Sequence, residues 1–133
     1  MNSDGVARRW HIALGVLFGM TGAMKLLVPA LGTAFAGQLA QAELPFLQLS
    51  RWGVPVLEMA IGLALLAGWY TRLATLLVIP IMLVATYVHL VVDDPSLFPL
   101  QPEAPAIPLT VLLVAGYLVW RDLGQTLNRK SKS

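Results

Sequence analysis

Cysteine is absent from this chain of 133 residues, and histidine occurs only twice. The absence of thiols excludes disulfides, CxxC redox pairs, thiolate metal sites and iron–sulfur clusters. The two histidines, His11 and His89, fall at opposite faces of the predicted membrane bundle, which are about 30 Å apart. They therefore cannot jointly ligate one haem, and we expect no metal site.

Charge is also scarce. Only 12% of the residues are charged whereas 57% are hydrophobic, and the mean hydropathy is +0.72. A soluble domain carries about 25% charged residues. These values predict an integral membrane protein. Because a helix needs about 20 apolar residues to cross the hydrocarbon, residues 1–133 have room for about four spans in one membrane domain. The net charge is only +2, and the basic residues gather at the termini and one short turn, a distribution that indicates topology rather than a nucleic-acid partner.

Four apolar runs each predict a transmembrane helix, and the last of them is short for a span unless residues 103–105 belong to it. They cover residues 10–29, 52–69, 73–92 and 106–120. Residues 30–51 between the first two runs are too rich in Gln and Glu to span. We expect a short amphipathic or re-entrant segment there, broken by Pro45. The predicted fold is an all-α, four-transmembrane-helix bundle.

Tryptophans and glycines mark the ends and faces of these runs. Indole rings favour the headgroup region, which predicts interface anchors at Trp10, Trp52, Trp69 and Trp120. Small residues let two helices approach closely, and such positions are Gly15, Gly19, Gly22 and Gly62. Glycine is also simply frequent in membrane helices.

Basic residues are concentrated at one side of the predicted bundle. That side holds Arg8, Arg9, Arg72, Arg121, Arg129, Lys130 and Lys132. Arg51 lies opposite. The positive-inside rule predicts that both termini face the cytoplasm of a bacterial inner membrane. The first apolar run is longer than a signal-peptide core and is interrupted by Lys25, so we expect it to remain as a span.

Three ionisable residues, Lys25, Glu58 and His89, lie near the opposite boundary. At 1.5 Å per residue, each is about 5–9 Å inside that boundary. We expect the three to meet in one polar pocket, with Lys25 and Glu58 forming an ion pair, because an unpaired buried carboxylate is costly. Lys25 and His89 could instead reach up to the interface, and the ion pair could serve only to fix helix packing.

The chain resembles the DoxX family of small four-helix bacterial membrane proteins over roughly Arg9 to Trp120. The first apolar run carries the family's spaced glycines and ends in the pattern G-x-x-K-L, here Gly22 to Leu26. The second carries the pattern E-x-x-x-G from Glu58 to Gly62, and Gly68 then precedes Thr71-Arg72. His89 matches a histidine near the outer end of the third run.

The resemblance implies a role in membrane redox complexes, such as thiosulfate:quinone oxidoreductase, and distant eukaryotic relatives are described as assembly chaperones. Our leading hypothesis is a small accessory subunit of a quinone-linked oxidoreductase, with partner proteins and with quinone as the candidate cofactor. One alternative is a membrane assembly factor that binds partner helices or a second copy of itself. Another is a small-solute or proton pathway.

Overall fold

The computed structural model describes residues 2–133, and this part of the chain folds into five α-helices and a short 3-10 helix without strands. The elements are α1 (Ser3–Leu27), α2 (Pro29–Gln41), α3 (Leu47–Ala67), α4 (Thr71–Val91), η1 (Pro95–Leu97) and α5 (Ala106–Ser131). The four helices α1, α3, α4 and α5 are long and apolar enough to cross a membrane. The predicted all-α, four-span fold is therefore confirmed.

Local sequence explains where the helices turn. Val28 adopts an extended conformation between α1 and α2, as is usual for a residue before proline. Gly68 ends α3 with a φ of 75°, and the Trp69 N–H donates to the Ala64 carbonyl over 2.9 Å. This glycine cap makes α3 and α4 consecutive antiparallel helices.

The helices extend beyond the apolar runs. α1 begins at Ser3 because the Asn2 side chain accepts a hydrogen bond from the Asp4 N–H and caps the helix. α5 continues past Trp120 to Ser131 through a polar segment. Hydropathy marks the membrane-compatible part of a helix rather than its ends.

The segment between the first two spans differs from the prediction in its boundaries. α2 ends at Gln41, before Pro45, and α3 begins at Leu47 rather than near Trp52. The break between them contains Glu43 and Phe46, both with positive φ. Pro45 therefore lies in the turn and interrupts no helix.

Close packing of α1 on α3 depends on glycine. A Cβ on Gly62 would lie 2.5 Å from the Gly19 backbone nitrogen, and a Cβ on Gly22 would lie 2.5 Å from the Pro55 carbonyl oxygen. Gly15 is nearly as tight against α3. A Cβ on Gly19 itself would meet nothing within 4 Å. Gly19 thus contributes through its backbone alone.

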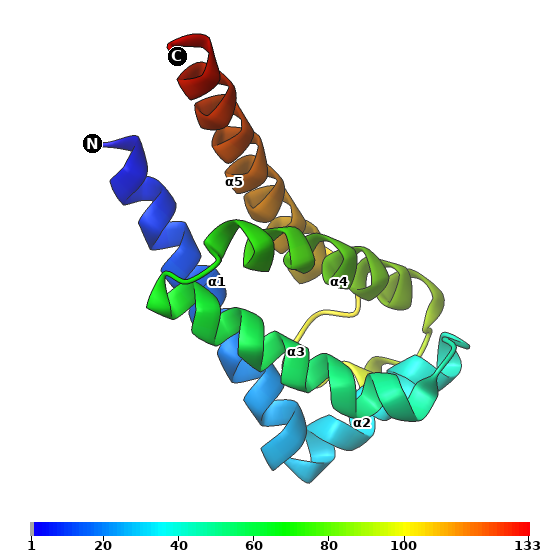
Figure 1. Cartoon of the computed structure of the whole chain (residues 1–133). Coiled ribbons are helices and arrows are strands. Elements are labelled where there is room, and N and C mark those ends of the chain that lie inside the picture. Colours follow the sequence, from blue (N-terminus) through cyan, green and yellow to red (C-terminus); the bar gives the residue numbers. More distant parts are fainter. Residues whose placement is uncertain (1) are drawn as a thin grey trace.

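The bundle has two distinct ends (Figure 1). The termini end holds the start of α1, the α3–α4 turn and the last part of α5 (Figure 1). The loop end holds α2, η1 and the loop of residues 92–105. A buried core between them includes Phe18, Leu65, Val78 and Leu118. The four tryptophans are exposed, from 43% at Trp10 to 72% at Trp120. Their anchoring role stays a prediction.

Candidate functional site

The predicted ion pair between Lys25 and Glu58 forms at the loop end. The Lys25 ammonium donates to both carboxylate oxygens, over 2.9 and 3.1 Å. The Glu58 side chain is 5% exposed and that of Lys25 is 24% exposed. Lys25 lies in the last turn of α1 and Glu58 in the middle of α3. The close contact of Gly22 with α3 brings the two helices near enough for the side chains to meet.

Helix α2 adds an aromatic ring to the ion pair. The Lys25 Nζ lies 4.3 Å from the centroid of the Phe35 ring, a favourable cation–π geometry. Phe35 is buried on α2. Sequence patterns did not identify this residue, because its contact depends on how α2 folds back after Val28.

His89 is near the outer end of α4 but makes different contacts. Its Nδ1 lies 2.8 Å from the backbone carbonyl oxygen of Glu103. Its ring lies against Phe98, with the centroids 4.3 Å apart and the planes tilted by 34°. The imidazole thus attaches the loop of residues 92–105 to α4. The acceptor of this hydrogen bond is a backbone carbonyl, which a pattern of side chains does not predict.

Lys25, Glu58 and His89 all line one cavity of about 750 Å³. Its walls come from every long helix, and most of them are aliphatic. Gln38 on α2 also lines it, and its side-chain amide donates to the Leu97 carbonyl. Small-molecule sites are typically about 300–1,000 Å³ and mainly apolar with a few polar groups. The cavity has the size and composition to hold an amphiphile.

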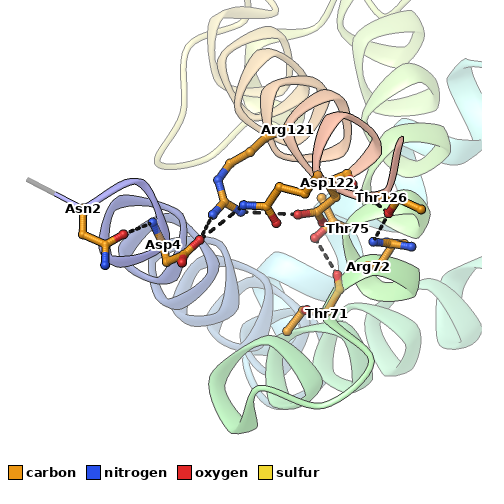
Figure 2. Close-up of polar contacts among 9 residues, drawn as sticks. Asn2, Asp4, Thr71, Arg72, Thr75, Arg121, Asp122 and Thr126 are labelled. Carbon is orange, nitrogen blue, oxygen red and sulfur yellow. Dashed lines mark hydrogen bonds and ion pairs between the residues drawn. The ribbon is translucent and has the colours of Figure 1, made fainter. Parts of the chain in front are cut away.

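The termini end holds a second polar cluster, which Figure 2 shows. Arg121 on α5 forms ion pairs with Asp4 on α1 and with its neighbour Asp122. Arg72 on α4 donates to the Thr126 hydroxyl over 2.9 Å. These contacts connect three helices.

Arg8 extends the contacts at the termini end to α3. Its guanidinium donates to the carbonyls of Leu65 and Leu66, over 2.7 Å each, in the last turn of α3, where no following helical turn supplies N–H donors. The positive-inside interpretation assigned these arginines to topology, and it missed that they also hold helices together. Arginine near a helix end is a weak signal for such contacts.

Other acidic and histidine residues do not gather into a metal site. Within residues 2–133, no group of three or more His, Asp or Glu side chains is placed to hold a metal ion. His11, on α1, is buried at the termini end and its Nε2 has no hydrogen-bond partner. The two histidines therefore lie in unrelated surroundings.

Comparison with known proteins identifies the family. A sequence model of the DoxX family matches residues 10–90. These residues include most of α1, all of α2 and α3, and all of α4 except Val91. The match contains Lys25, Glu58 and His89 and ends before the loop of residues 92–105 and α5, short of the predicted limit at Trp120. No curated protein and no solved structure matches. The chain belongs to the DoxX family.

Proposed function

We propose that this protein is a small membrane subunit of a quinone-linked redox complex and that a quinone-type headgroup binds beside Lys25 and Glu58. The observation that carries the proposal is the mainly aliphatic cavity of about 750 Å³, with a partly buried ion pair in its wall. A long apolar tail suits the aliphatic walls. The partly exposed ammonium of Lys25 can donate to a headgroup oxygen.

The protein's own side chains limit its part in the reaction. The sequence has no cysteine, and no metal-binding group is found among the described residues. We propose that partner proteins carry the electrons, while this subunit binds and orients the quinone within the membrane. The role is that of an accessory subunit.

The test of the proposal is the content of the protein purified from its native membrane. We expect mass spectrometry of an organic extract to find quinone at about one molecule per chain, and co-purification to find redox proteins. The variant Glu58→Gln keeps the shape of the side chain but removes the charge that holds Lys25, and we expect it to lower quinone-coupled activity. Absence of quinone together with an unaffected activity would refute the proposal. Capture of assembly partners alone would favour an assembly factor.

The orientation we propose places both termini and the α3–α4 turn in the cytoplasm of a bacterial inner membrane. The excess of arginine and lysine at the termini end supports it. Because the sequence has no cysteine, single-cysteine variants at Ser96 and Ser133 report on each side without background. A membrane-impermeant maleimide should label Ser96→Cys in intact spheroplasts and leave Ser133→Cys unlabelled. Labelling of Ser133→Cys but not of Ser96→Cys would show that the protein has the opposite orientation.

A further inference from the structure

The ion pair leaves the cavity with more hydrogen-bond acceptor positions than donor positions. The Lys25 ammonium has three N–H groups, and it donates to both oxygens of Glu58. A carboxylate offers about four lone-pair positions, and these two contacts fill half of them. One N–H and two acceptor positions are left at the ion pair.

His89 contributes another acceptor. A carbonyl oxygen can only accept, so the bond between Nδ1 and the Glu103 carbonyl requires the proton on Nδ1. In the neutral imidazole, Nε2 then carries a lone pair and accepts a hydrogen bond. The Phe98 ring packs against His89, with the centroids 4.3 Å apart. Neutral His89 therefore offers an acceptor, and no donor, to a ligand in the cavity.

Gln38 and Thr21 each use a side-chain donor on a backbone carbonyl. The Gln38 amide nitrogen donates to the Leu97 carbonyl, and the Thr21 hydroxyl donates to the Phe18 carbonyl. Gln38 keeps its second N–H and its amide oxygen for a ligand in the cavity, whereas Thr21 has used its only proton and keeps only an oxygen that accepts. Ser50 and Gln101 also line the cavity and keep their donors, but Ser50 precedes Glu58 by two helical turns, about 12 Å closer to the loop end.

The charge of the wall adds a second criterion. Lys25 and Glu58 neutralise each other, and a charged headgroup would bring an uncompensated charge into an apolar cavity. We infer that the cavity selects a neutral amphiphile whose headgroup donates hydrogen bonds, and hence that it prefers the hydroxyl form of a quinone-type compound, the quinol, over the carbonyl form. The choice of quinone rests on the proposed function, whereas the preference for a donor rests on the geometry of the wall.

A redox-inert pair of ligands tests the donor preference directly. We would measure binding of 4-nonylphenol and of its methyl ether to the full chain in lipid nanodiscs. The two compounds share tail and ring, and only the phenol can donate. We expect the phenol to bind about tenfold more tightly. Equal affinity, or tighter binding of the ether, would overturn the inference.

A variant of His89 tests where the preference arises. In His89→Asn, the amide nitrogen takes the place of Nδ1 and can still donate to Glu103, while the amide oxygen takes the place of Cδ2 and falls one bond short of the position from which Nε2 accepts. We expect the phenol-to-ether affinity ratio to fall to about threefold or less, and thermal unfolding shows whether the fold is kept. Arg8→Met, at the termini end, is the matched control and should leave the ratio unchanged. A ratio that stays at the wild-type value in His89→Asn would overturn the role given to the ring.

Binding of a short-chain quinone and its quinol, measured without oxygen, separates this inference from the proposed function. Tighter binding of the quinone would refute the inference and leave the quinone-linked function standing. A clear preference for the phenol, without any quinone in the native protein, would support the inference and refute the quinone-linked function. If no compound binds, both fail.

Discussion

The two ends of the bundle use their polar residues in opposite ways. At the termini end, the arginines bond to carboxylates, to a hydroxyl and to the last carbonyls of a neighbouring helix. At the loop end, Lys25, Glu58 and His89 face a cavity and keep part of their hydrogen-bonding capacity free. A polar cluster whose groups bond mainly to one another connects helices. A polar cluster beside a cavity can in addition bind a ligand.

The ion pair at the loop end gives the largest expected effect on stability. Removing one partner of a fully buried pair leaves an uncompensated charge and costs about 3–5 kcal/mol, and the partial exposure of Lys25 places this pair at the lower end of that range. We expect Glu58→Leu to lower the free energy of unfolding in detergent by about this amount, and the double variant Lys25→Met/Glu58→Leu to recover most of the loss. The double variant should also select a donor headgroup less strongly than the wild type, because the two acceptor positions of Glu58 are lost while the His89 acceptor is kept. A double variant as unstable as Glu58→Leu alone would contradict the comparison.

The glycine contact between the two ends gives the next largest effect. Gly62→Ala places a methyl group within 2.5 Å of the Gly19 nitrogen, and such overpacking costs about 1–3 kcal/mol. Gly19→Ala is the matched control, since its methyl group would meet nothing within 4 Å. We expect Gly19→Ala to be neutral or slightly stabilising. Thermal unfolding of both variants measures the difference, and equal losses would show that the close contact of α1 and α3 is wrong.

Arg8 tests the termini end with a smaller effect. Arg8→Met removes two hydrogen bonds to the end of α3, and because the group is partly solvated we expect a loss of about 1 kcal/mol. Hydrogen exchange should rise in the last turn of α3 and stay unchanged around Glu58. Ligand affinity should also stay unchanged. A lowered affinity would mean that the two ends are not separate.

Asp94, in the loop, gives the smallest effect. Hydrogen bonds from the Ser96 side chain and backbone hold the pKa of Asp94 below its ordinary value of 3.8. A lowered pKa stabilises the fold above the unfolded value, and this contribution is lost as the pH falls through the folded value. Carboxyl NMR should find the lowered pKa, and Ser96→Ala should move it back toward 3.8. An unchanged pKa in that variant would exclude the Ser96 hydroxyl as the main cause.

The sequence predicted the spans and the ion pair for physical reasons that act locally or in simple order. Apolar runs of membrane length specify the helices, and an up-down arrangement brings Lys25 and Glu58 to the same level. Their pairing followed because a buried lone carboxylate is costly.

What the sequence did not predict depends on turns and on backbone atoms. Phe35 reaches Lys25 because α2 folds back after Val28, and His89 bonds to a carbonyl that any residue at position 103 would supply. The arginine contacts at the termini end were not predicted, because the positive-inside rule already explained why arginines occur there. The cavity itself is a property of all helices together, and no single pattern encodes it.

The most direct test of the account is the affinity of a short-chain quinol for three proteins measured side by side in nanodiscs. They are the wild type, the variant Ala85→Trp, which places a large ring in the cavity wall, and Arg8→Met at the termini end. We expect binding to the wild type and to Arg8→Met with equal affinity and no binding to Ala85→Trp. Binding to Ala85→Trp at the wild-type affinity would show that the cavity at the loop end is not the site.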